Sequence, residues 1–174
     1  MSNTCPPILV KRVSSEAKLP QRAYPTDSGL DVSAYSILKR YTNGLEVKVF
    51  SAQEDLIRWK EGELTYIFKS GEIILISTGL IATVGPGFEI QVRPRSGLAL
   101  KRGITVLNTP GTVDELYRNE IGVILINHSG VDQEIKYQEK IAQLVVCPVV
   151  LSEVIEVADL SDTARGLGGF GSTN

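Results

Sequence analysis

The last ten residues of the chain carry groups that can hold a nucleotide. Residues 165–174 contain one arginine, one phenylalanine and four glycines, with no periodic apolar pattern. Glycine loses much conformational freedom on ordering, so this segment is not expected to fold alone. Arg165 can pair with a phosphate and Phe170 can stack on a base, so the segment can order over a nucleotide as a lid. An ordinary flexible chain end is the alternative.

A second set of candidate groups follows a strand-like run at residues 88–93. Arg95, Ser96 and Gly97 present a guanidinium, a hydroxyl and an approachable amide one after another. If a helical turn begins here, its N-terminus adds partial positive charge, and phosphate is the ligand that this combination fits. The set lacks the further glycines and the lysine of a P-loop, so a polar turn between a strand and a helix is the alternative.

The stretch at residues 108–120 offers an amide, a carboxylate and an aromatic ring. Asn108 can donate and accept hydrogen bonds through one amide, as recognition of a nucleobase edge requires. Asp114 directly follows Val113, and a carboxylate beside an apolar side chain suits a general base. The Tyr117 ring can pack on a sugar. An ordinary turn with a solvated aspartate is the alternative.

Two further polar positions lie beside apolar runs. Asp31 opens an alternating run after a glycine turn, where it can orient a magnesium-bound water, brace another strand or form an Asx turn. Gln143 lies inside an apolar run, so its amide must either hold a loop or face a ligand. His128 lies in a turn, and neither Cys5 nor Cys147 has a partner at metal-ligand spacing, so no direct protein metal site is predicted.

A β framework is needed to position these groups, and short β-branched runs bounded by glycine and proline predict one. Residues 108–120 lie between two such runs, which predicts the tip of a long hairpin with its turn at Pro110-Gly111. Many short strands with few helices predict an all-β fold, an antiparallel sandwich or jelly-roll-like barrel. The predicted strands are residues 7–13, 71–79, 88–93, 104–107, 121–127 and 141–149.

Residues 36–70 depart from this pattern. Asn43-Gly44 between two strand-like runs is the strongest short-range signal for a hairpin. Ser51 and Glu54 form a capping box, which predicts a short helix over residues 51–60. Trp59 on that helix is expected to pack against the fold, because large aromatic side chains mostly bury area.

The whole chain has the length and composition of one ordinary domain. It has 174 residues and a net charge of −2, which argues against a general electrostatic grip on nucleic acid or an anionic membrane. No apolar run is long enough to span a bilayer, and the first residues lack the plan of a secretory signal. Two cysteines do not make a disulfide framework, so the cytoplasm is the expected compartment.

Five segments, in order, closely resemble the five signature motifs of the trimeric dUTPases (deoxyuridine triphosphate nucleotidohydrolases). The resemblance extends from about residue 8 to the C-terminus, apart from residues 36–70. One such motif is weak evidence, but five in the correct order are specific and favour ligand binding over ordinary turns. The five segments are residues 27–31, 94–98, 111–118, 141–144 and 165–173.

The resemblance implies a jelly-roll-like subunit and a homotrimer in which each active site is built from three chains. Residues 1–164 would form the β domain, and residues 165–174 of one subunit would close over a neighbour's site. The implied reaction is hydrolysis of dUTP to dUMP and diphosphate, which limits uracil incorporation into DNA and supplies dUMP for dTMP synthesis. Mg²⁺ is the implied cofactor, held by the triphosphate and waters rather than by a direct protein ligand.

Carried over by position, the resemblance also gives each candidate residue a role. Asp114 would activate the water that attacks the α-phosphorus, and Asp31 would support the site. The uracil and the deoxyribose would be contacted by Asn108, Gly111, Val113, Tyr117 and Phe170. The phosphates would be held by Arg95, Ser96, Gly97, Gln143, Arg165, Ser172 and Thr173.

The sequence departs from the family pattern at Leu116, at Asn119 and above all in residues 36–70, where the family has a shorter connection. None of these departures removes a group from the implied chemistry. A dCTP deaminase shares the fold and is a second enzyme alternative, but Ser96-Gly97 lacks the glutamate that its family uses there as a proton shuttle. A regulatory or docking protein that acts through residues 36–70 is the third alternative.

Overall fold

The computed structural model describes residues 6–42, 45–47 and 65–168. Regular structure in this part of the chain is almost entirely β-strand. Among these residues no helix has the length and apolar character needed to cross a membrane. The elements, in chain order, are β1 (Leu9–Arg12), β2 (Leu30–Ser33), β3 (Ser36–Thr42), β4 (Leu45–Val47), β5 (Thr65–Phe68), β6 (Ile73–Ser77), β7 (Leu80–Thr83), β8 (Phe88–Arg93), α1 (Ser96–Arg102), β9 (Ile104–Val106), β10 (Gly111–Val113), β11 (Gly122–Asn127), β12 (Gln133–Lys136) and β13 (Lys140–Pro148).

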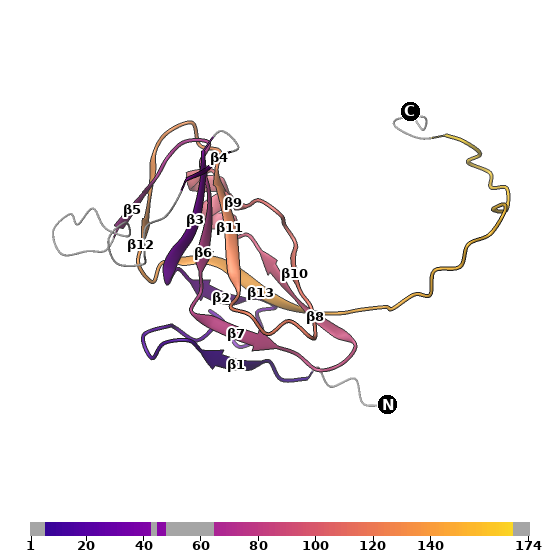
Figure 1. Ribbon diagram of the computed structural model, residues 1–174, viewed down its shortest axis with the longest axis horizontal. Helices are drawn as coiled ribbons and strands as arrows, with labels where there is room; N and C mark the ends of the chain where they lie inside the picture. Colours follow the sequence, from indigo (N-terminus) through magenta and orange to yellow (C-terminus); the bar gives the residue numbers. More distant parts are fainter. Residues whose placement is uncertain (1–5, 43–44, 48–64, 169–174) are drawn as a thin grey trace.

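Two antiparallel sheets form the body of the fold (Figure 1). One has four strands in the order β10-β8-β13-β2, and the other has five in the order β4-β3-β6-β11-β9. Two ribbons, β1 with β7 and β5 with β12, lie beside them. Neighbours such as β2 and β13 come from distant parts of the chain, as the crossing connections of a jelly roll require. The predicted all-β, jelly-roll-like class is confirmed.

The core is filled by alternate residues of the strands, because successive side chains of a strand point to opposite faces. Ile74 and Ile76 of β6 are buried, and so are Ile90 and Val92 of β8. Full burial of one such aliphatic side chain contributes about 1.5–3 kcal/mol, so a one-residue slip would be costly. This alternation therefore also decides which polar residues of β8 and its neighbours face outward.

All six predicted strands are present, with their ends shifted by no more than two residues. β3 pairs with β4, and Thr42 lies opposite Leu45, so the hairpin predicted around residues 43–44 is confirmed by its two arms. The two turn residues themselves, and the helix predicted over residues 51–60 with Trp59, lie outside the described residues. β5 was not predicted, and it pairs with β12 where the 36–70 segment ends.

The segment at residues 108–120 differs from the predicted hairpin tip. Its flanking strands do pair, since Val106 of β9 lies opposite Leu125 of β11. The prediction of a turn at Pro110-Gly111 is wrong, however, because Gly111 is the first residue of β10 and pairs with Val92 of β8 in the other sheet. The intervening turn falls at residues 107–110 and contains a cis Thr109–Pro110 bond. The chain thus crosses between sheets at this point.

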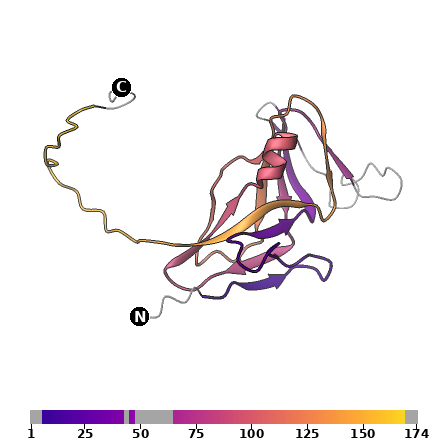
Figure 2. The same ribbon diagram turned by 180° about the vertical axis from the view of Figure 1, so that it is seen from behind.

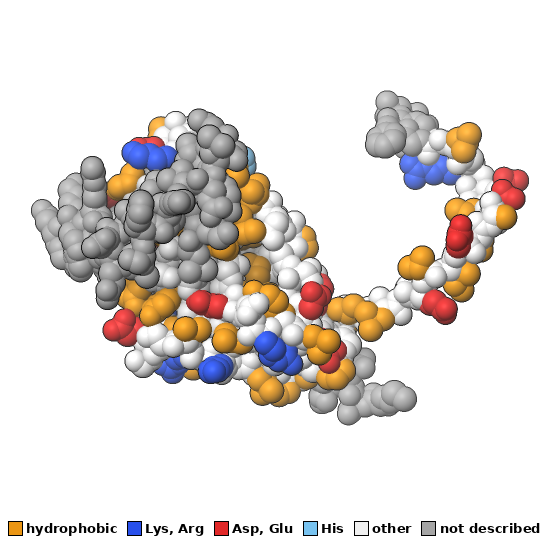
Figure 3. Space-filling model, in the orientation of Figure 1, with side chains coloured by type: hydrophobic (Ala, Val, Ile, Leu, Met, Phe, Trp, Pro, Cys, Tyr) orange, Lys and Arg blue, Asp and Glu red, His pale blue; other side chains and the backbone are white. Residues whose placement is uncertain are grey.

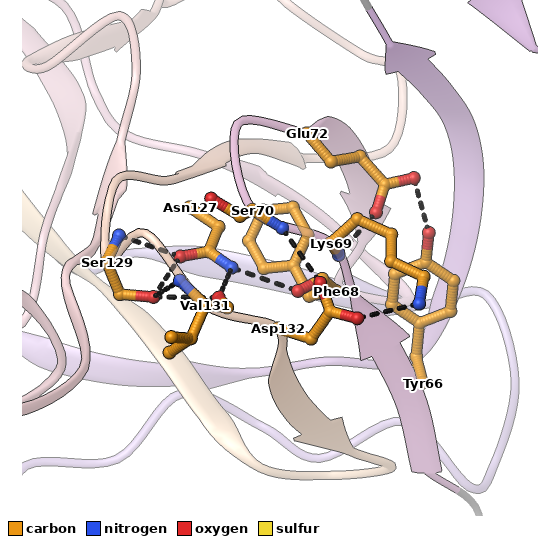
Figure 4. A network of polar contacts seen from close by, with 9 residues as sticks. All are labelled: Tyr66, Phe68, Lys69, Ser70, Glu72, Asn127, Ser129, Val131 and Asp132. Carbon is orange, nitrogen blue, oxygen red and sulfur yellow. Dashed lines mark hydrogen bonds and ion pairs between the residues drawn. The ribbon is translucent and has the colours of Figure 1, made fainter.

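A polar network ties β5 to the body where the 36–70 segment returns (Figure 4). The fully buried Asn127 donates its amide hydrogens to the carbonyl oxygens of Phe68 and Val131, both at 2.9 Å. Glu72, also fully buried, accepts from the Tyr66 hydroxyl at 2.7 Å. Buried polar groups require such partners, so this network fixes the return of the segment to the described fold.

Candidate active site

One polar cluster forms around Arg95, the residue that precedes α1. Its Nε donates to Oδ1 of Asp31 at 3.0 Å, and its Nη1 donates to the carbonyl oxygen of Lys140 at 3.1 Å. The second carboxylate oxygen of Asp31 pairs with Nζ of Lys140 at 2.9 Å. Asp31 thus braces Arg95, one of the roles considered from the sequence. Nη2 of Arg95 has no hydrogen-bond partner among the described residues, so it can donate to a ligand.

Gln143 of β13 fixes the backbone just before Arg95. Its Nε2 donates to the carbonyl oxygen of Pro94 at 2.9 Å. The amide also packs against Gly29, where a Cβ would lie only 2.0 Å from Oε1, so only glycine permits this approach. The sequence left open whether Gln143 holds a loop or faces a ligand, and the structure shows that it holds the Pro94 loop. We call Asp31, Arg95, Lys140 and Gln143 the Arg95 cluster.

Ser96 and Gly97 open the helix that the sequence made conditional. Both residues are exposed, and the space around a Cβ at Gly97 is open. At the other end, Gly103 has a left-handed backbone with φ of 59°, and its N–H donates to Ala99. This glycine ends the helix after Arg102. The exposed hydroxyl and amide therefore stand beside the Arg95 cluster, free to contact a ligand.

A small pocket of about 130 Å³ lies at the segment that crosses between the sheets. Four residues predicted to contact uracil or deoxyribose line it together. The Asn108 amide packs against Gly111, where a Cβ would lie 3.1 Å from Nδ2. A pocket for a complete drug-sized ligand is about 300–1,000 Å³, so this one suits a base rather than a whole nucleotide. Its lining residues are Val92, Asn108, Gly111, Thr112, Val113, Tyr117, Ile121 and Gly122.

Asp114 lies at the rim of this pocket, directly after the buried Val113. Its side chain is exposed, and its carboxylate has no hydrogen-bond partner among the described residues, so its lone pairs are available to a water. The N–H of Tyr117 donates to the Asp114 carbonyl at 3.0 Å, which closes a turn between the two residues. The Tyr117 hydroxyl donates to the carbonyl of Glu120 at 3.0 Å, which orients the ring.

The pocket and the Arg95 cluster lie on opposite faces of the four-stranded sheet. Gly111 pairs with Val92, on the buried face of β8. Gln143 pairs with Arg93 and with Asp31, on the other face. Paired residues share a face and successive residues alternate, so the two sets point in opposite directions. One chain does not bring its own candidate phosphate ligands and base pocket together.

The C-terminal segment also lies away from both sets. Residues 149–168 leave the body after β13 and extend outward (Figure 2). Leu151, Val154 and Leu160 on this segment are exposed, as the orange side chains along it show (Figure 3). Arg165 donates only to the carbonyl of Gly168, at 2.8 Å, within the described part of the chain. Phe170, Ser172 and Thr173 lie outside the described residues.

Several contacts of the site were not predicted from the sequence. Lys140 shares Asp31 with Arg95, and Thr83 and Glu120 contact the backbone or the neighbours of the turn that carries Asp114. Thr83 is 31 residues away from Asp114 in the chain, and no local pattern marks it. Within the described ranges, no group of three or more His, Cys, Asp or Glu side chains is placed to hold a metal ion.

Comparison with known proteins identifies the family. Residues 62–174 match the family model described as dUTPase. The deoxyuridine 5'-triphosphate nucleotidohydrolase of Alkaliphilus metalliredigens is 43% identical over 95% of this chain and 96% of its own length. That of Gloeothece citriformis is 46% identical over 94% of each chain. The solved dUTPase of Staphylococcus bacteriophage 80alpha, a mutant with dUpNHpp, shares the fold with a TM-score of 0.72, at 21% identity over 98% of each chain. The chain described above belongs to the dUTPase family.

Proposed function

We propose that this chain hydrolyses dUTP to dUMP and diphosphate. The observation that carries the proposal is the base-sized pocket with the free carboxylate of Asp114 at its rim. Membership of the dUTPase family, and the name shared by the two relatives above, support the same substrate. The dCTP deaminase alternative is not favoured, because no carboxylate follows Arg95 at Ser96-Gly97.

The pocket residues divide the recognition of the nucleoside between them. The Asn108 amide and the backbone at Gly111 and Val113 hold uracil. Tyr117 packs on the deoxyribose and leaves no room for a 2′-hydroxyl. One extra methyl in an apolar pocket costs only about 1–3 kcal/mol, so exclusion of thymine relies on the closely packed backbone of this segment.

The Asp114 carboxylate acts as the general base. It takes a proton from a water, whose oxygen forms a bond to the α-phosphorus while the bond from that phosphorus to the bridging oxygen breaks. Diphosphate leaves with the electron pair of that bond. Arg95, braced by Asp31, neutralises charge that develops on the phosphate oxygens, together with Ser96 and Gly97. From the tail, Arg165, Ser172 and Thr173 hold the γ-phosphate, and Phe170 stacks on the base.

The active protein is a homotrimer with shared active sites. A nucleotide in the pocket of one chain is expected to extend its phosphates toward the Arg95 cluster of another, because one chain holds the two sets on opposite faces of a sheet. The extended segment at residues 149–168 supports the same assembly. Its exposed apolar side chains are typical of an interaction surface, and a neighbouring subunit would cover them.

Magnesium fits this donor set as a companion of the substrate. Mg²⁺ keeps several waters and binds through one or two carboxylates together with substrate phosphates. The described residues provide single carboxylates such as Asp114 rather than a cage, so the triphosphate and waters would hold the ion. A bound ion would neutralise charge on the phosphates. A solved relative from phage phi11 is described with a structural Mg(II) ion, which is consistent with this choice.

The cytoplasm is the proposed site of action, where the reaction would limit uracil incorporation into DNA and supply dUMP for dTMP synthesis. The test of the proposed reaction is diphosphate release from dUTP beside UTP, dTTP and dCTP, with and without magnesium. We expect release from dUTP alone, dependent on magnesium. Ammonia from dCTP, or no reaction with any nucleotide, would contradict the proposal.

The role of Asp114 is tested by Asp114→Asn, which keeps the shape of the side chain but not its basicity. We expect the variant to bind dUpNHpp as tightly as the wild type and to lose at least about a hundredfold in turnover, as the loss of a general base does. Near-normal diphosphate release by this variant would exclude Asp114 as the base.

A further inference from the structure

The turn that joins Asp114 to Tyr117 is held from behind by two side chains outside it. The Thr83 hydroxyl donates to the carbonyl oxygen of Glu115 at 2.9 Å, and Nη1 of Arg118 donates to the same oxygen at 2.6 Å. A carbonyl oxygen has two lone pairs, so this one is fully used. The residue directly after the proposed base therefore has a fixed carbonyl direction.

The two side chains also contact each other. Nη1 of Arg118 donates to the Thr83 hydroxyl at 3.2 Å and to the carbonyl of Tyr117 at 2.9 Å. The hydroxyl, the guanidinium and the Glu115 carbonyl thus form a closed triangle, which we call the turn clamp. Thr83 is the last residue of β7 and pairs with Leu9 of β1, so the clamp connects the turn to a strand pair.

A second anchor holds the far end of the same segment. The Glu120 carboxylate accepts from the N–H of Gly79 at 2.6 Å and from the hydroxyl of the buried Ser77. Since Glu120 also accepts the Tyr117 hydroxyl through its carbonyl, the ring is fixed relative to the β6–β7 connection. Between this anchor and β10, the turn clamp is what holds the backbone that carries Asp114.

The clamp contributes position rather than burial. Arg118 is exposed, and an arginine that folds back onto its own backbone loses rotamer freedom. Leu116 in the same turn is 81% exposed, so apolar packing does not hold the turn in place. A general base must stand within about 2.6–3.2 Å of the group whose proton it takes. A misplacement of about 1 Å can lower the rate about a hundredfold.

We infer that Thr83 and Arg118 are positioning residues that act through the Glu115 carbonyl to hold Asp114 and Tyr117 in their working geometry. The inference rests on the proposed function, because it takes Asp114 as the base. It assigns to a strand residue far from the pocket lining a direct effect on turnover. A purely structural role would instead change melting temperature and leave the rate per folded site unchanged.

Thr83→Val tests the clamp, because valine keeps the shape and removes the hydroxyl. We expect kcat on dUTP to fall about 10- to 100-fold, while the dissociation constant of dUpNHpp changes less than about threefold. Thr83→Ser keeps the hydroxyl and should restore most of the turnover. Thr105→Val in β9 is the matched control, since this strand threonine makes no side-chain hydrogen bond among the described residues, and its kcat should equal the wild-type value.

Arg118→Gln removes the second donor and tests the clamp even if Thr83→Val fails to fold. It should lower kcat by a similar factor with the trimer and the melting temperature little changed. Wild-type kcat in folded Thr83→Val or Arg118→Gln would overturn the inference. If the wild type itself releases no diphosphate from dUTP, the proposed function fails instead, so the two failures are distinguishable.

Discussion

Gly29→Ala tests how the Arg95 cluster is held together. A Cβ at Gly29 would lie 2.0 Å from Oε1, 2.9 Å from Cδ and 3.3 Å from Cβ of Gln143. The Cβ of Gln143 is fixed to β13, so only its amide can move away. The hydrogen bond from that amide to Pro94 is then lost, and the backbone next to Arg95 is released.

The size of the effect follows from these contacts. A lost neutral hydrogen bond costs about 0.5–1.5 kcal/mol, and a carbonyl left unpaired adds part of a desolvation penalty of about 1–3 kcal/mol. Replacing glycine with alanine returns about 0.4–1 kcal/mol through the unfolded chain. We expect a net loss of about 1–2 kcal/mol, which lowers Tm by about 2–8 °C in a chain of this size. The Kd of dUpNHpp should rise about tenfold if about 1.4 kcal/mol of phosphate binding is lost.

A double-mutant cycle isolates the mechanism. Gln143→Ala removes the amide that a Cβ at Gly29 would strike, so Gly29→Ala should add almost nothing in that background. Tm and the Kd of dUpNHpp are measured for the two single variants, the double variant and the wild type. Additive losses in the double variant, or wild-type values in Gly29→Ala alone, would refute the account of the contact between Gly29 and Gln143.

Two further predictions concern parts of the chain outside the pocket. Removal of residues 165–174 should leave Tm unchanged and lower dUTP turnover at least about tenfold, because Arg165 and the hydroxyls beyond it would no longer close over the phosphates; an unchanged rate would end the lid argument. A hydrogen bond from Lys69, with a second from the Ser70 N–H, lowers the pKa of Asp132 below its usual value. A carboxyl with a lowered folded-state pKa stabilises the fold above its unfolded pKa, and this contribution disappears as pH falls through the folded value. The wild type should therefore be more stable than Asp132→Asn at neutral pH, with the difference in Tm closing in acid; a pH-independent difference would contradict this reading.

The strands were predictable because their apolar residues alternate and glycine or proline bounds each run. The jelly-roll-like class followed from the number and spacing of those strands. What no local pattern marks is pairing between distant strands. Gly111 looked like a turn residue because it follows Pro110, yet it begins β10 and pairs with Val92 in the other sheet. Tertiary pairing decided that position over local turn preference.

The candidate site shows the same division. Asp114, Arg95 and Gln143 stood out because their chemistry contrasts with their neighbours in the sequence. The contact between Arg95 and Asp31 joins residues 64 positions apart, and the sequence alone offered bracing only as one alternative. Thr83 was missed because a single hydroxyl at the end of a strand is ordinary until the fold places it against the turn that carries Asp114.

The central claim is that one active site takes its base from one subunit and its phosphate-binding arginine from another. Asp114→Asn and Arg95→Ala are each expected to be inactive as pure proteins. When the two are unfolded together in equal amounts and refolded, about a quarter of the sites in random trimers should combine an intact Asp114 with an intact Arg95. Diphosphate release from dUTP at about that fraction of the wild-type rate is the predicted result. No gain over the two separate variants, in a mixture shown to contain mixed trimers, would contradict the claim.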